Sequence, residues 1–210
     1  MTPFVEFARR YLPAPPARLL EVGCGQGELT TALAVAGYDV LGIDPAAPLG
    51  ELFRRLTLEE LDEPGRYDGV IAARSLHHIR DLESALDRIA SLLRPDGMFV
   101  VEEFVWDRLD EPTLEWLYRQ RCALSVAGAG ESPDSVQALR EEWDADHLGL
   151  HGDEALRRGL ARFDERAFVR TPYLHRLLED PAVEVLEQAL VDSGELRALG
   201  FRFAGRLRQT

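Results

Sequence analysis

The chain has 210 residues, of which 46% are hydrophobic, and this is enough for one well-buried core. Its formal net charge of -13 works against a phosphate-backbone partner, because nucleic-acid binding rests on clustered basic residues. No apolar run approaches the roughly 20 residues that cross a bilayer, and residues 1–13 mix acid and arginine where a signal peptide needs an apolar stretch. We therefore expect a cytoplasmic protein with no nucleic-acid and no membrane partner.

The chain opens with apolar side chains at helical spacing, and strands and helices then alternate. A buried strand is predicted over 18–22, and a loop that contains Gly23, Gly25 and Gly27 separates it from a helix. A second strand follows over 38–44. These elements form a β-α-β unit, which predicts two parallel strands.

The alternation continues toward the middle of the chain. Residues 67–73 predict a strand that leads to a pair of histidines, and Asp81 caps the helix that follows. A turn at residues 94–97 precedes a strand over 98–104. Apolar strands that alternate with helices indicate an α/β fold whose parallel sheet is covered on both faces.

Residues 106–180 form a long segment that is rich in tryptophan, arginine and acid, with helical spacing at 155–163 and elsewhere. We predict a helical insertion after the fifth strand that acts as a cap and substrate-binding region. Helices packed on the surface of the sheet are the alternative. Residues 189–194 predict a last helix, and 196–207 predict the closing antiparallel strands. We expect one domain over residues 1–210.

The alternating glycines indicate a ligand that comes close to the backbone. In parallel sheets the ligand lies beyond the carboxyl ends of the strands, which is where this loop falls. A dinucleotide-binding loop would place its third glycine at position 28, beside a pyrophosphate, but this chain has Glu28 there. A phosphate-bearing ligand such as NAD is therefore disfavoured, and a tight structural turn is the other alternative.

Glu21 followed by Gly23, Gly25 and Gly27 resembles motif I of the class I S-adenosylmethionine (SAM)-dependent methyltransferases. The strings YDGV from Tyr67, SLHHI from Ser75 and LLRPDG from Leu92 resemble the small-molecule group of that family, methyltransferase type 11. The resemblance covers residues 17–105. It implies a Rossmann-like, doubly wound, mostly parallel seven-stranded sheet, a SAM cofactor with S-adenosylhomocysteine as product, and a small-molecule methyl acceptor.

The resemblance also implies which residues contact the cofactor. The glycine loop would cradle the methionine end of SAM, and Asp44 would accept hydrogen bonds from two ribose hydroxyls. The rest of the expected cofactor set is Glu21, Cys24, Pro45, Thr57, Leu58, Ala73 and Arg74. Thr57 stands where the family usually carries an Asp toward the adenine. Residues 45–52 are too few for the helix that normally links the second and third strands.

The implied reaction is an in-line methyl transfer that needs positioning and, for a hydroxyl acceptor, a base. His77 and His78 follow the fourth strand and are candidate bases, with shaping of the cofactor pocket as the alternative. His147 and His151 are further candidates on one helix face, but the Glu of the HExxH motif is missing and we predict no metal. Candidate substrate contacts, for which core packing is the alternative, are Trp106, Trp143, Tyr173 and His175.

The sequence thus predicts a SAM-dependent methyltransferase that acts on a small molecule, at oxygen first, with nitrogen and carbon as alternatives. A SAM-binding protein that transfers no methyl group is a second hypothesis. A methyltransferase of RNA or protein is a third, against which the acidity argues. Cys24 and Cys122 have neither disulfide-framework nor zinc-site spacing, and nothing in the sequence specifies an oligomeric state.

Overall fold

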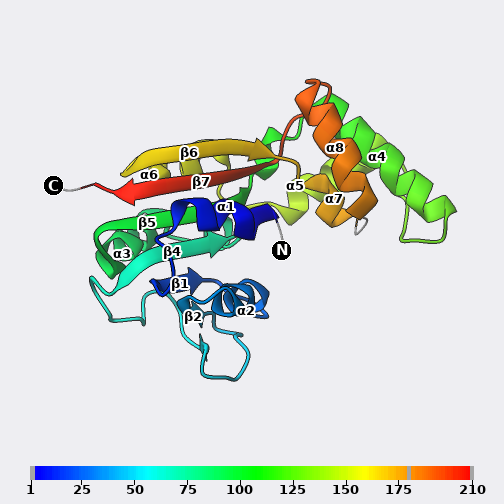
Figure 1. Cartoon of the computed structure of the whole chain (residues 1–210). Coiled ribbons are helices and arrows are strands. Elements are labelled where there is room, and N and C mark those ends of the chain that lie inside the picture. The colour runs from blue at the N-terminus through cyan, green and yellow to red at the C-terminus, as the bar shows by residue number, and fades with distance from the viewer. Residues whose placement is uncertain (1–2, 179–180, 209–210) are drawn as a thin grey trace. The chain divides into compact units, whose positions relative to one another are not determined.

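The computed structural model of the chain describes residues 3–178 and 181–208. Its centre is a seven-stranded sheet with the strand order β3-β2-β1-β4-β5-β7-β6 (Figure 1). Strand β1 (Arg18–Val22) pairs in parallel with both β2 (Asp39–Ile43) and β4 (Tyr67–Ala73). Strand order therefore reverses at β1, and the predicted doubly wound, mostly parallel seven-stranded sheet is confirmed.

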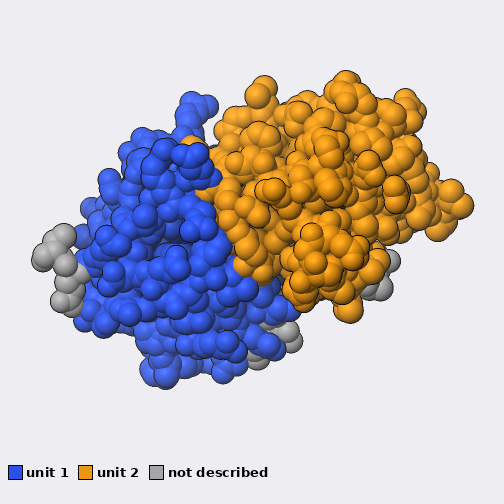
Figure 2. Space-filling model, turned by 90° about the horizontal axis from the view of Figure 1, so that it is seen from above, with its two compact units in different colours: residues 1–103, 154–169, 202–210 blue, residues 104–153, 170–201 orange. Residues whose placement is uncertain are grey.

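The described residues divide into two compact units, drawn in blue and orange in Figure 2. The first unit comprises residues 1–103, 154–169 and 202–210, and it holds most of the sheet. Its helices are α1 (Pro3–Tyr11), α2 (Glu28–Val35), α3 (Leu82–Leu92) and α6 (Asp153–Leu160), of which α6 begins with the last residue of a second-unit segment. Its remaining strands are β3 (Phe53–Arg54), β5 (Leu93–Phe104), β6 (Phe163–Thr171) and β7 (Gly200–Leu207), and the last three extend into the second unit.

The core of the first unit forms where the apolar strands meet their helices. Leu19 on β1, Ile71 on β4 and Val100 on β5 are fully buried, and Phe4 and Ala8 of α1 belong to the same cluster. Full burial of such side chains stabilises each by about 1.5–3 kcal/mol relative to exposure. This packing fixes the strand ends from which the functional loops emerge.

The second unit comprises residues 104–153 and 170–201 and is helical. Its helices are α4 (Glu111–Val126), α5 (Val136–Asp146), α7 (Leu174–Leu177) and α8 (Pro181–Asp192). Asp110 caps α4 by accepting from the backbone N–H of Thr113, and Ser135 caps α5 in the same way through Ala138. The helical insertion predicted after the fifth strand is confirmed, while its extent over 106–180 and the single domain over 1–210 stay predictions.

Three sequence-based boundaries are corrected by the structure. The helical pattern at 155–163 ends at Leu160, and β6 lies inside the segment predicted as helical. Strand β6 is an edge strand whose Asp164, Glu165 and Arg166 are exposed, so it lacks the apolar run of a central strand. Only β7 follows the last helix, and it runs opposite to β6 (Figure 1). The closing pair is thus β6 and β7.

The turn predicted at 94–97 lies within β5. Leu93 pairs with Tyr67, Met98 pairs with Gly69, and the register shifts between these two pairs. Asp96 has a positive φ of 69°, as expected where extra residues bulge out of a ladder.

Strands β2 and β3 have no helix between them, as the sequence predicts. Among the described residues, none of the helices combines the length and the apolar character that a membrane crossing requires.

Candidate active site

The glycine loop joins β1 to α2 at the point where strand order reverses. Gly23, Gly25 and Gly27 have φ values of 73°, 51° and 81°, which side chains with a Cβ rarely adopt. A Cβ on Gly23 would lie 2.5 Å from the Cβ of Ser75, and a Cβ on Gly27 would lie 2.4 Å from the Phe53 ring. At Gly25 no atom lies within 4 Å of that position. The loop is therefore closed at both ends and open at Gly25.

Asp44 follows β2 and lies beside this opening. Its Oδ2 accepts a hydrogen bond from the backbone N–H of Gly25 at 3.2 Å, and its Oδ1 accepts one from Ala46 at 2.7 Å. The side chain is half-buried, while the neighbouring Pro45 is exposed. Each carboxylate oxygen has a second lone pair, so Asp44 can accept further hydrogen bonds from a ligand.

Glu21 and Cys24 lie under the loop. Glu21 is only 2% exposed and accepts a hydrogen bond from the hydroxyl of Thr30 on α2. Burial raises the pKa of Glu21 to about 7, against a smaller opposing effect of that hydrogen bond. Burial likewise raises the pKa of the Cys24 thiol to about 12. The structure thus ties Glu21 to α2, and its predicted contact with a cofactor stays a prediction.

The end of β4 meets the glycine loop through Ser75, whose Oγ donates to the backbone carbonyl of Val22 at 2.9 Å. Arg74, next to Ala73, has a φ of 57°, which is unusual outside glycine and often marks functional loops. Its backbone N–H donates to the carbonyl of Glu102 at 2.7 Å, and its guanidinium lies 3.8 Å from the Glu102 carboxylate. These contacts hold the strand end in its left-handed turn.

The two histidines predicted as candidate bases, His77 and His78, have different surroundings. They belong to a short 3-10 turn, Leu76–His78, and their rings lie 4.0 Å apart. His78 is exposed, whereas His77 is 5% exposed and its Nδ1 lies 2.5 Å from Oε2 of Glu103. Glu103 is fully buried and also accepts from the backbone N–H of Leu76 at 2.7 Å.

Sequence reasoning missed Glu103 and Phe53. Two adjacent acids, Glu102 and Glu103, interrupt an otherwise apolar strand, and acids buried in this way are almost always paired. That signal could have found Glu103. No sequence pattern marks Phe53 as a site residue, because it closes the glycine loop through its contact with Gly27.

The predicted adenine-side residues lie on the short stretch after β3. Thr57 is exposed, and its backbone N–H donates to the carboxylate of Glu60 at 2.7 Å. Leu58 is 5% exposed. Leu58 therefore offers little apolar surface, and Thr57 keeps its hydroxyl at the surface.

These residues fit SAM as the ligand. The opening at Gly25 gives close access to the backbone, and Asp44 supplies acceptors for hydroxyl groups. Glu28 in the first turn of α2 places negative charge where a phosphate ligand would bind, and this suits a cofactor with cationic groups and no phosphate.

The second unit brings three predicted residues together. The indole N–H of Trp143 donates to the carbonyl of Trp106 at 3.2 Å, and Nδ1 of His147 lies 2.6 Å from the carbonyl of Trp143. Helix α5 ends at Asp146 and Gly149 has a positive φ. The prediction that His147 and His151 share one helix face is therefore wrong. Within the described part of the chain, no group of three or more possible ligands is placed to hold a metal ion.

Tyr173 and His175 have partners of their own. The Tyr173 ring stacks on Phe104 at 4.2 Å. His175 is 8% exposed, and its Nδ1 lies 3.0 Å from Oε2 of Glu187. Burial would raise the pKa of Glu187, but hydrogen bonds from His175 and from the backbone N–H groups of residues 173–175 hold it below its usual range.

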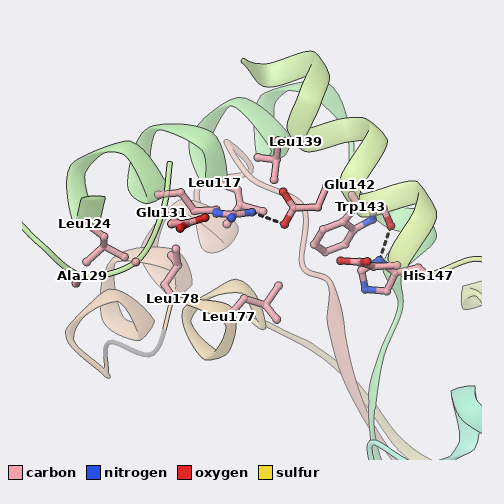
Figure 3. Close-up of a pocket in the computed structure, with 13 residues that line it drawn as sticks. Leu117, Leu124, Ala129, Glu131, Leu139, Glu142, Trp143, His147, Leu177 and Leu178 are labelled. Atoms are coloured by element: carbon pink, nitrogen blue, oxygen red, sulfur yellow. Dashed lines mark hydrogen bonds and ion pairs between the residues drawn. The ribbon is translucent and has the colours of Figure 1, made fainter. Parts of the chain in front are cut away.

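A cavity of about 820 Å³ lies within the second unit (Figure 3). Of the predicted site residues, Trp143 and His147 line it, and Trp106, Tyr173 and His175 are outside its lining. The other lining residues are Leu117, Arg121, Leu124, Ala129, Gly130, Glu131, Leu139, Glu142, Asp146, Leu177 and Leu178.

Comparison with known sequences identifies relatives that match part of the chain. A ubiquinone biosynthesis O-methyltransferase from Rhodopseudomonas palustris is 34% identical over an alignment of 97 positions, which covers 40% of this chain and 38% of that protein. The match thus spans well under half the length of the relative.

Solved structures share the fold. A SAM-dependent methyltransferase from Mesorhizobium loti has a TM-score of 0.60 and 16% identity, covering 96% of both chains. The 1,6-didemethyltoxoflavin-N1-methyltransferase from Burkholderia thailandensis has a TM-score of 0.58 and 20% identity, covering 99% of this chain and 77% of that chain.

The sequence model of one family, described as a methyltransferase domain, matches residues 2–150. Because this match covers more than half of the chain, the chain belongs to the methyltransferase domain family.

Proposed function

We propose that this protein transfers a methyl group from SAM to a small-molecule acceptor, at oxygen. The observation that carries the proposal is the glycine loop, which is open at Gly25 directly beside the carboxylate of Asp44. The family and the fold support SAM as the cofactor.

In this proposal Gly23, Cys24, Gly25 and Gly27 hold the methionine end of SAM through their backbone. Asp44 accepts hydrogen bonds from the ribose hydroxyls, with Pro45 next to it. The remaining contacts are assigned to Thr57 and Leu58 on the adenine side and to Glu21, Ala73 and Arg74 on the methionine side. SAM supplies the methyl group, and the protein supplies position and a proton acceptor.

We assign different roles to the two histidines of the 3-10 turn. His78 is exposed and is the proposed acceptor of the hydroxyl proton. His77 is the proposed positioning residue, because its Nδ1 is held by the buried carboxylate of Glu103, which also receives the backbone N–H of Leu76. This pair anchors the turn that carries His78.

The acceptor assignment rests on relatives. Oxygen as the acceptor atom is drawn from the ubiquinone biosynthesis O-methyltransferase named above, and nitrogen is drawn from the N1-methyltransferase. The cap region over 106–180, with Trp106, Trp143, His147, His151, Tyr173 and His175, is the proposed location of acceptor contacts. The acidic chain supports a cytoplasmic small-molecule enzyme over one that acts on nucleic acid.

Calorimetric titration with SAM, S-adenosylhomocysteine and NAD tests the cofactor assignment. We expect micromolar binding of the two sulfur compounds and none of NAD. Asp44→Asn should weaken SAM binding about tenfold, while Asp39→Asn, at the other end of the same strand, should leave it unchanged. Equal SAM affinity in wild type and Asp44→Asn would show that the cofactor site is wrongly placed.

A SAM-binding protein without methyl transfer is the second candidate. It is favoured by the missing helix between β2 and β3 and by the exposed Thr57 in place of an acid. Formation of S-adenosylhomocysteine in the presence of a set of small phenols separates the two. Tight SAM binding with no product from any acceptor would favour the second candidate.

A further inference from the structure

The cavity of the second unit has apolar walls from three helices (Figure 3). Leu117 of α4, Leu139 and Trp143 of α5 and Leu178 beside α7 are each less than a tenth exposed, and they also belong to the core of this unit. Leu177 is 49% exposed and gives the wall an apolar surface toward solvent. A volume of about 820 Å³ lies within the range of roughly 300–1,000 Å³ that is usual for small-molecule sites.

The polar groups that line this cavity are mainly acidic. Arg121 lies 2.8 Å from Glu142, so these two charges neutralise each other. Glu131 and Asp146 are exposed, and neither forms an ion pair with a residue that the structure describes. The lining therefore carries negative charge that no cation of the lining compensates.

We propose that this cavity binds an apolar molecule that carries a positively charged amine, and that such a molecule is the methyl acceptor. The second part rests on the methyl transfer proposed above. The apolar walls would hold the hydrocarbon or aromatic body, and the Trp143 and His147 rings, whose centres lie 4.4 Å apart, offer flat surfaces to an aromatic one. Glu131 and Asp146 would attract the amine and repel a carboxylate or phosphate.

Three probes that differ in one group test the charge preference: tyramine, para-ethylphenol and para-hydroxyphenylacetate. All three share the phenol ring, and at neutral pH they carry a positive, no and a negative side-chain charge. Titration of the full chain at low salt should show tyramine binding at least about fivefold tighter than para-ethylphenol, and para-hydroxyphenylacetate binding more weakly than both. Equal affinity for the three probes would overturn the proposal.

Two variants locate the binding site. Glu131→Gln combined with Asp146→Asn should reduce tyramine binding to the level of para-ethylphenol and leave para-ethylphenol unchanged. Leu177→Gln should weaken all three probes about equally. Asp144→Asn is the matched control, because Asp144 is an exposed acid of the same helix α5 that does not line the cavity. If Asp144→Asn also lost the preference for tyramine, the preference would be a general effect of charge, and the assignment of the binding site to the cavity would be wrong.

The acceptor assignment has its own readout. With SAM present, tyramine should give S-adenosylhomocysteine with a KM at least about fivefold below that of para-ethylphenol, and the double variant should remove this difference by raising the KM for tyramine. If SAM does not bind at all, the proposed function fails while the amine preference of the cavity can still stand. If SAM binds and para-ethylphenol has the same KM as tyramine, the acceptor class is wrong.

Discussion

Nδ1 of His77 lies 2.5 Å from Oε2 of Glu103, and both side chains are buried. The same carboxylate accepts a hydrogen bond from the backbone N–H of Leu76, so Glu103 holds both the His77 ring and the turn that carries His78. Such a hydrogen bond fixes which ring nitrogen carries the proton.

Glu103→Gln should therefore lower kcat at least about tenfold while SAM affinity changes less than twofold. The amide oxygen can still receive the Leu76 N–H, but the variant loses the charge that holds Nδ1–H of His77. The measurement is a pH profile of kcat together with a SAM titration, and the profile should shift if His77 positions the base. A parallel loss of SAM affinity, or an unchanged profile, would assign Glu103 a purely structural role.

Gly25→Ala should leave the fold intact and weaken SAM binding at least about tenfold. The new methyl group meets no protein atom, so the cost to stability is the left-handed strain alone, about 1 kcal/mol. Gly65→Ala is the matched control, because Gly65 has a φ of +61° and equally open surroundings. The two variants should be equally destabilised in thermal melts, and only Gly25→Ala should affect calorimetric titration with SAM. An unchanged SAM affinity in Gly25→Ala would contradict the proposal that the glycine loop binds SAM through its backbone.

The first unit should lose stability as the pH rises from about 4.5 to about 7. Burial raises the pKa of Glu21 from 4.5 to about 7, so the folded protein holds this proton more tightly than the unfolded chain does. Its stabilising effect is complete below pH 4.5 and is lost as pH rises through about 7, an effect on the order of 3 kcal/mol. Hydrogen exchange of the α2 amides at several pH values measures it. Glu21→Gln should flatten the pH dependence of stability. A pH dependence as steep in Glu21→Gln as in wild type would assign the effect to another titratable group.

The second unit should respond to pH in the opposite direction. Hydrogen bonds hold the pKa of Glu187 below its ordinary value of 4.5, so its stabilising effect is present above that value and is lost as the pH falls through the folded pKa. Glu187→Gln should lower the unfolding free energy at pH 7 by about 1–3 kcal/mol and weaken the acid dependence. All three tryptophans, Trp106, Trp116 and Trp143, lie in this unit, so urea unfolding followed by tryptophan fluorescence reports on it. A wild-type acid slope in the variant would contradict the assignment.

The strand-and-helix alternation of the first hundred residues and the neighbourhood of Gly25 and Asp44 could be predicted, because buried parallel strands and left-handed glycines leave local patterns. Strand β6 could not, since an edge strand with exposed Asp164, Glu165 and Arg166 has the charge pattern of a surface helix.

Contacts between distant residues were also beyond the sequence. Glu103 meets His77 across 26 positions, and the cavity wall joins Leu117, Trp143 and Leu177 from three helices. No local period encodes such a meeting, because it depends on how the elements pack.

The two cysteines differ in a way that is useful in the laboratory. Burial raises the pKa of Cys24 to about 12 and keeps its sulfur covered, so an alkylating reagent at neutral pH should pass it by. Cys122 is only half-buried, on α4, one residue from the Arg121 that lines the cavity. A maleimide dye should therefore label the natural chain at one position, and its emission would follow the filling of the cavity without any engineered cysteine.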